Sequence, residues 1–423
     1  MVCNCFWMKK NYKYVLCFVW VSISFNCNNE VDMVSSSGTN SIIDIEGAPE
    51  LDQYFYDRTY LNVDSIRFLP LEQTNNSLIS EVEKLIFCDD SFIVFDEDQN
   101  RVMRFDSKTG EFLNSFGSYG KGPGEFFDIR DVAYNNTGEL VYLFDYANRE
   151  ILCFNISGSF RGEKSFSIPE DLIFNAIEYY SGFLVGVNYL FTGEYKDKII
   201  IMDSNNGKIV GSGLRSPYVR PPELNPILGK TGRYPKLHRG HDGIYITEYL
   251  NDTLYRLTGN GEIENYIMLN FNTLYPSEEF LKESDRTKLE RIVASRFTFG
   301  VERLAISEDY IFLKYYYGDL DQGTNQYIIY HKDNQFVFDC GYEFQVDHIP
   351  VYPIHYGSDT TLVSCTIYPV LKSYQYLFEI NKKNNPDAWN STKEKLSHNI
   401  DTYLSEHPDY TNPVLFVYSI ADD

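Results

Sequence analysis

The chain has 423 residues, of which 16% are aromatic, and it carries a formal net charge of −23. An acidic chain repels the phosphate backbone of nucleic acids, so this charge argues against a nucleic-acid partner. The 35 tyrosines and 30 phenylalanines are residue types that fit best in β-strands, and they indicate a large β-rich core.

Residues 1–27 have the pattern of a lipoprotein-type export signal. Lysines follow Met8, the predicted start, and an uninterrupted apolar stretch then runs from Tyr14 to Phe25. A basic start before a short apolar segment is typical of a secretory signal and is too short to span a bilayer comfortably. Cys27 lies where a bacterial lipoprotein signal has its lipidated cysteine, although Asn26 replaces the usual small residue. The alternative is a cleaved signal in which Cys27 is incidental.

This signal predicts a location in the cell envelope, either facing the periplasm or at the outer-membrane surface. The lipid anchor would be the chain's only link to a membrane. Residues 28–60 begin with a polar stretch and are predicted to be a tether. The folded part is predicted to span residues 61–423.

Two stretches of this folded part repeat each other. Phe95–Asp106 and Phe144–Asn155 align at an offset of 49 residues, and each reads as strand, polar turn and strand because apolar and polar residues alternate. Weaker copies are expected at 182–212, 242–271 and 308–339, and in the pair Asp359–Ile367 and Tyr374–Ile380. Six units about 40–50 residues apart predict an all-β, six-bladed β-propeller.

Two segments break the strand pattern, and two strands have no local partner. Pro276–Phe297 and Asp387–His407 are predicted to be short helical insertions on the rim. The strand Ser65–Glu72 precedes the first full repeat, and Asn412–Ile420 follows the last. Because closure of a ring removes exposed sheet edges, these two strands are predicted to share one blade.

The stretch "GSYGKGPGEFF", Gly117 to Phe127, lies between the first two repeats. A phosphate-binding P-loop would need Ser or Thr after its lysine and a helix beyond it, and both are missing here. We therefore expect a connection between blades. Loops on the faces of propellers often bind partners, so the predicted binding loops contain Gly120, Gly122, Pro123, Gly124, Arg215, Tyr218 and Arg220.

The glycine stretch resembles NHL-type repeats, in which a Gly-rich connection ending in Gly-x-Phe leads into the next blade. More narrowly, the chain resembles six-bladed β-propeller lipoproteins of unknown function from Gram-negative gut-type anaerobes. The matching pieces are "GKGPGEF", "YLNDTLYRL", "YIMLNF" and "NPVLFVYSI", and the resemblance covers about residues 60 to 423. It implies a fold and export, and no established reaction.

Two groups of residues are candidate metal ligands. Asp96, Asp98 and Asn100 have the alternate spacing of a calcium loop, but Arg101 and Ser107 stand where an EF-hand type loop has Gly and Glu. A hairpin turn rich in Asp and Asn explains the spacing well and is favoured.

His238 and His241 are three residues apart, with His348 and His355 in a later repeat. Some NHL-type enzymes hold a metal in the central channel through histidines of different blades, and catalytic zinc needs about three such ligands. Scattered surface histidines are the alternative.

No catalytic motif appears, and a Gly-x-Ser-x-Gly elbow is missing. The sequence therefore favours a module that binds a protein or a glycan over an enzyme. The alternative is an NHL-like metal-dependent lyase or lactonase in the central channel, with calcium or zinc as the candidate cofactor. A structural subunit of an envelope assembly is a third possibility. No CxxC pair occurs, and Cys88, Cys153, Cys340 and Cys365 are expected to be buried thiols, with disulfide pairing in an oxidising compartment as the alternative.

Overall fold

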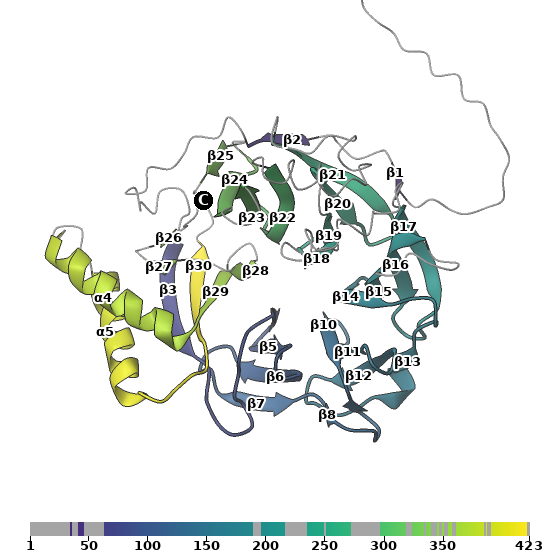
Figure 1. Ribbon diagram of the computed structural model, residues 1–423, viewed down its shortest axis with the longest axis horizontal. Coiled ribbons are helices and arrows are strands. Elements are labelled where there is room, and N and C mark those ends of the chain that lie inside the picture. The colour runs from purple at the N-terminus through teal and green to yellow at the C-terminus, as the bar shows by residue number, and fades with distance from the viewer. Residues whose placement is uncertain are drawn as a thin grey trace, which may run out of the picture. The chain divides into compact units, whose positions relative to one another are not determined.

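The structure, a computed structural model, describes most of the chain from residue 34 onward (Figure 1). The described residues are 34–35, 41–45, 63–188, 196–215, 235–248, 251–271, 297–318, 324–333, 336–339, 345–346, 349–350, 354–357, 361–384, 386 and 391–420. All of them belong to one compact unit, Asp32–Asp423.

The described strands form six blades around a central axis, which confirms the predicted six-bladed propeller (Figure 1). Blade 1 consists of β4 (Lys84–Cys88), β5 (Ser91–Asp96), β6 (Arg101–Asp106) and β7 (Phe112–Ser115). Blade 2 consists of β10 (Ile129–Asn135), β11 (Leu140–Asp145), β12 (Glu150–Asn155) and β13 (Phe166–Ser167). Blade 3 consists of β14 (Phe174–Tyr180), β15 (Phe183–Asn188), β16 (Asp197–Asp203) and β17 (Ile209–Arg215). Blades 4 and 5 are β18 (Lys236–Arg239), β19 (Ile244–Thr247), β20 (Thr253–Leu257) and β21 (Ile263–Asn270); and β22 (Phe297–Ile306), β23 (Tyr310–Gly318), β24 (Thr324–His331) and β25 (Phe336–Asp339). Within each of these blades the first strand is the innermost, so the chain runs outward.

Blade 6 takes strands from both ends of the chain, as predicted. It contains β28 (Ile354–Gly357), β29 (Thr361–Thr366), β30 (Val414–Ile420) and, outermost, β3 (Val63–Pro70). β3 pairs with β30 in antiparallel register, from Val63 opposite Ile420 to Pro70 opposite Val414. The ring therefore closes through backbone hydrogen bonds between segments more than 330 residues apart.

Short elements lie outside the blades or extend one of them. They are β8 (Ser118–Tyr119), β9 (Glu125–Phe126), β26 (Gln345–Val346), β27 (Ile349–Pro350) and the 3-10 helix η2 (Gly162–Lys164). β1 (Val34–Ser35) and β2 (Ser41–Asp44) both pair in parallel with β21. β2 falls within the segment assigned to a polar tether, and Ile43 and Ile45 are buried there. This stretch extends blade 4 because its two isoleucines cover apolar residues of β21.

The hydrophobic core is divided among the interfaces between neighbouring blades. Each described cluster of buried apolar residues joins two adjacent blades, as Phe95 of blade 1 and Val132 of blade 2 do in one of them. Both faces of every sheet are covered by neighbours, which explains strands with consecutive buried residues such as Ser91–Asp96. Each innermost strand is thereby held firmly on the central channel.

Two helices interrupt blade 6 between β29 and β30. α5 (Ser391–Glu406) confirms the second predicted insertion. α4 (Tyr368–Asn384) corrects the sequence analysis, which interpreted Tyr374–Ile380 as a strand. Leu371, Tyr374 and Phe378 are buried in one cluster, and their spacing is that of one helical face packed against α5 and blade 6. Neither described helix is long and apolar enough to cross a membrane.

The other predicted insertion, Pro276–Phe297, lies outside the described residues except for Phe297, which begins β22. Cys88, Cys153 and Cys365 are free thiols within strands. Burial raises the pKa of each of these three thiols to about 12, so they are poor nucleophiles. Cys340 lies outside the described residues.

Candidate functional site

A cavity of about 790 Å³ lies where the innermost strands of the blades surround the central axis. Side chains of β4, β10, β14, β18 and β22, together with residues next to these strands, form its described walls. The lining is rich in charge, with lysine, arginine, aspartate and glutamate contributed by five different blades. Its volume is that of a small-molecule site. We call it the central cavity.

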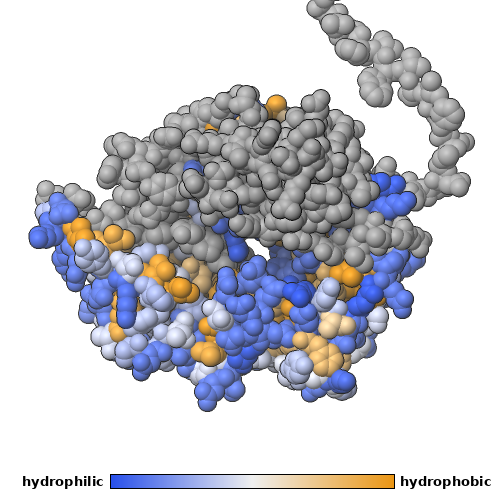
Figure 2. Space-filling view, viewed as in Figure 1, coloured by the Kyte–Doolittle hydropathy of each residue, from blue (hydrophilic) through white to orange (hydrophobic). Residues whose placement is uncertain are grey.

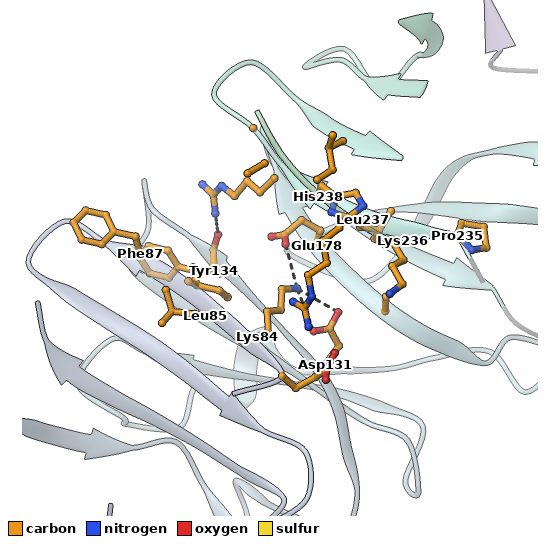
Figure 3. A pocket seen from close by; sticks show the side chains of 18 of the residues that line it. Lys84, Leu85, Phe87, Asp131, Tyr134, Glu178, Pro235, Lys236, Leu237 and His238 are labelled. Carbon is orange, nitrogen blue, oxygen red and sulfur yellow. Dashed lines mark hydrogen bonds and ion pairs between the residues drawn. The ribbon is translucent and has the colours of Figure 1, made fainter. Parts of the chain in front are cut away.

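In one part of the central cavity, a single lysine is paired with two carboxylates. The Lys84 ammonium donates to Asp131 at 3.1 Å, lies 3.1 Å from a Glu178 oxygen and donates to the Ile177 carbonyl at 3.0 Å. Figure 3 shows Lys84 reaching toward both carboxylates. Burial alone would lower the pKa of Lys84, but Asp131 and Glu178 outweigh it and the pKa is raised. Because these residues come from β4, β10 and β14, the cluster ties three blades together.

Two other cations of the central cavity lack such partners. Lys236 on β18 and Arg303 on β22 both line the central cavity, and among the described residues neither forms an ion pair or a side-chain hydrogen bond. Burial lowers the pKa of Lys236, and Arg303 lowers it further, although Glu302 and Glu83 act in the opposite direction. We call Lys236 and Arg303 the cationic corner.

The two carboxylates near the cationic corner neutralise its positive charge only in part. Glu302 lies 2.8 Å from the Lys314 ammonium. Glu83 has access to solvent, yet the surrounding walls desolvate it and raise its pKa, against the pull of Arg303 and Lys236. The corner thus combines excess positive charge with a carboxylate whose charged form is disfavoured.

His238 lies on the cavity wall beside the cationic corner (Figure 3). Its Nε2 is 3.1 Å from the Thr247 hydroxyl. Burial, followed by the charges of Lys236, Arg303 and Lys84, lowers the pKa of His238 to about 3. The imidazole is therefore neutral at physiological pH, and the positive field that keeps it neutral also opposes a divalent cation.

The second predicted histidine ligand lies near the first but is exposed. His241 lines the same cavity, and its Nδ1 lies 3.7 Å from Asp242. Within the described residues, no three His, Cys, Asp or Glu side chains are grouped closely enough to hold a metal ion. His348 and the side chain of His355 lie outside those residues.

The calcium candidates serve a turn between strands. Asp96 is fully buried, and its two carboxylate oxygens accept from the backbone N–H groups of Ser80 at 2.6 Å and Gln99 at 3.1 Å. Asn100 links blade 1 to the following connection, since its amide binds the Phe127 carbonyl and the Ile129 N–H. Asp98, an exposed residue, is next to them in the turn. A calcium ion would have to displace the backbone donors of Asp96.

The glycine stretch connects blades 1 and 2 near the outer strands (Figure 1). β8 and β9 pair within it, and the Gly122 N–H donates to the Glu125 carboxylate at 2.7 Å. Gly124 has φ of +78°, and a Cβ there would lie 2.9 Å from Phe160. Its glycines thus serve tight packing, as expected of a connection.

None of the predicted binding-loop residues that the structure describes lines the central cavity. These are Gly120, Gly122, Pro123, Gly124 and Arg215. Arg215 ends β17, and its Nε donates to Asp197 at 2.9 Å. Tyr218, Arg220 and Cys27 lie outside the described residues, so their assignment to binding loops and to lipidation stays a prediction.

Comparison with known proteins places the chain in a family. Residues 41–419 match the family described as Domain of unknown function (DUF4934). The chain belongs to this family. In this DUF4934 chain the match spans the six described blades, and the expected resemblance to propellers of unknown function is confirmed. No curated protein matches it.

Among the solved structures similar to this DUF4934 protein, one with a TM-score above 0.5 shares its fold. A crystal structure from Bacteroides fragilis NCTC 9343, of a protein assumed to be exported, is 18% identical with a TM-score of 0.63, covering 90% of this chain and 100% of that chain. A member of the duf4221 family from Bacteroides vulgatus is 8% identical with a TM-score of 0.49, covering 85% of this chain and 97% of that chain.

The sequence analysis missed the charged residues that line the central cavity. A signal for them does exist, because Lys84, Asp131 and Glu178 are each 47 residues apart (131 − 84 and 178 − 131). Each is a charged residue in an innermost strand that is otherwise largely apolar. A charge recurring at the repeat distance in such a strand indicates the channel wall. Lys236 and Arg303 do not keep this distance.

Proposed function

We propose that the protein is an exported, lipid-anchored β-propeller that binds a small polar ligand in its central cavity. The proposal rests on charged and polar side chains of the cavity wall that have no ion-pair or hydrogen-bond partner among the described residues. Besides the cationic corner, the buried Asn175 Oδ1 has no hydrogen-bond partner among the described residues. Buried polar groups are rarely left unpaired, and a ligand with donors and anionic oxygens would satisfy them.

The surface supports a polar ligand more than an apolar protein contact. On the face drawn in Figure 2, the described residues are mainly hydrophilic, with hydrophobic ones in scattered patches. Exposed large apolar side chains are distributed over several elements, such as Tyr119 at 74% on β8, although Val370, Tyr376 and Leu377 share α4. Scattered exposed apolar residues are normal, whereas a docking site for an apolar partner needs a continuous patch.

Ligand binding in the cavity can be tested with residues 32–423, the compact unit of the chain. Sugars, sugar acids, amino acids and short peptides are screened by the rise in Tm. Asn136 is an exposed residue of the cavity wall. We expect N136W to abolish the response to any compound that binds, and N136A to retain it. A response that survives N136W would place the ligand elsewhere and refute binding in the cavity.

Export and anchoring rest on the N-terminal pattern and on the assumed export of the Bacteroides fragilis relative. They are tested by expressing the full chain in a Bacteroides host with an alkyne-bearing fatty acid. We expect labelled protein in the membrane fraction, and we expect Cys27→Ala to lose the label. Unlabelled wild-type protein released from the cells would refute the anchor.

A further inference from the structure

We infer that the cationic corner is a subsite for one carboxylate group of the ligand, held between Lys236 and Arg303. This inference rests on the proposed binding of a ligand in the central cavity. It names the charge of that ligand and the two side chains that recognise it.

The position of the two cations points to a ligand contact. Lys236 and Arg303 are on the innermost strands of blades 4 and 5, which are neighbours in the ring, and both side chains line the cavity. The other basic residues of this wall have partners, for Lys84 binds Asp131 and Arg130 lies 2.9 Å from Glu97. Arg239, also on the wall, donates to the Tyr134 carbonyl, whereas neither residue of the cationic corner has an ion pair or a side-chain hydrogen bond among the described residues.

The charged residues around the cationic corner indicate the charge of the group that would bind there. Three cations, Lys236, Arg303 and Lys314, face two carboxylates, Glu302 and Glu83. His238 adds no positive charge, because its low pKa keeps it neutral. Among the charged groups that act on Lys236, counting both carboxylates as ionised, the balance is therefore one positive charge in excess. Partly buried cations are costly without a counter-charge.

A single carboxylate fits this balance better than a doubly charged anion does. One negative charge neutralises the excess, whereas a second would face Glu302 and Glu83. Arginine binds the planar carboxylate through two parallel N–H donors, and lysine adds a point charge. The rest of the ligand would be neutral and polar, since Asn175 also lines the cavity and its buried Oδ1 has no partner among the described residues. A small shift of this side chain would let the Oδ1 accept a hydrogen bond from a donor such as a hydroxyl.

The first test compares two lysines of one cavity wall. Repulsion between Lys236 and Arg303 opposes folding. If Lys236 serves a ligand and not the fold, K236Q should therefore leave the Tm of residues 32–423 unchanged or raise it. The matched variant K84Q removes the lysine that neutralises Asp131 and Glu178, and it should lower the Tm. A Tm lowered as much by K236Q as by K84Q would show a structural role for Lys236 and overturn the inference.

The second test compares acids with their amides, using lactate with lactamide and glucuronate with glucuronamide at equal ionic strength. We expect an acid to raise the Tm more than its amide does. K236Q and R303Q should each abolish this difference, whereas R130Q, which changes a paired arginine of the same wall, should keep it. Equal responses to acid and amide would overturn the inference, as would phosphate or sulfate displacing the acid at lower concentration.

The variants also separate this inference from the proposed function. If amides bind as well as acids and N136W abolishes both, cavity binding stands and the carboxylate subsite falls. If binding of either persists in N136W, the proposed function itself falls, and the subsite falls with it.

Discussion

Titration of the His238 imidazole should lower the free energy of unfolding in mild acid. Its pKa is about 3 in the folded chain because burial and the charges of Lys236, Arg303 and Lys84 disfavour protonation. In the unfolded chain the pKa returns to about 6.5. Between these values only the unfolded state binds the proton, so the free energy of unfolding decreases as the pH falls from about 6.5 toward 3.

The size of this effect follows from the pH interval. Each unit below the unfolded pKa is worth about 1.4 kcal/mol for one proton, so at pH 5 the upper bound is about 2 kcal/mol. The central cavity is lined in part by exposed residues such as Glu83 and His241, so solvent can screen the neighbouring charges, and we expect about 1–2 kcal/mol. The replacement H238Q keeps a side chain that can hydrogen bond Thr247 and cannot titrate.

The assay is urea unfolding of residues 32–423 and of H238Q at pH 7.5 and at pH 5.0. Wild-type protein should lose about 1–2 kcal/mol more than H238Q between the two pH values. H241Q, which removes the exposed histidine three residues away, controls for the loss of an imidazole in general. Equal losses in wild type and H238Q would refute the reasoning, because His238 would then titrate alike in both states.

Three further predictions concern the ring, each checked by urea unfolding of residues 32–423 at pH 7.5. N412A should lower the free energy of unfolding by about 2–4 kcal/mol. The buried Asn412 amide forms hydrogen bonds with three backbone groups of residues 72–79, and these bonds join the two ends of the chain where the ring closes. A loss below about 1 kcal/mol would contradict this role. K84M should cost about 3–5 kcal/mol because it leaves the carboxylates of Asp131 and Glu178 uncompensated, and a stable K84M would mean that they share a proton. G124V should destabilise the chain more than G182V, since a Cβ at Gly124 meets Phe160 whereas one at Gly182 meets nothing within 4 Å and both have positive φ; equal losses would leave only backbone strain as the cause.

The fold could be predicted because its signals are local. Alternating apolar residues indicate strands, repetition indicates blades, and unpaired strands at both ends indicate closure. The same reasoning failed at Tyr374–Ile380, where a short aromatic stretch suits either period. Burial of Leu371, Tyr374 and Phe378 on one face decides for a helix, and that burial depends on α5 and blade 6.

The site could not be predicted in the same way because its contacts cross blades. Asn412 reads as an ordinary residue before a strand, and its partners lie 333 or more residues away in the sequence. Lys84 and Lys236 are likewise both lysines in innermost strands. Only the ring geometry pairs the first with Asp131 and leaves the second beside Arg303.

The difference between Lys84 and Lys236 distinguishes a residue that stabilises the fold from one that serves a ligand. The cores between blades and the β3–β30 closure hold the ring without any contribution from the cationic corner. Lys84 joins three blades, so folding alone accounts for it. Lys236 is partly buried next to a like charge, which opposes folding, and an apolar residue there would be more stable. A residue that costs stability in the wall of a cavity is best explained by what the cavity binds.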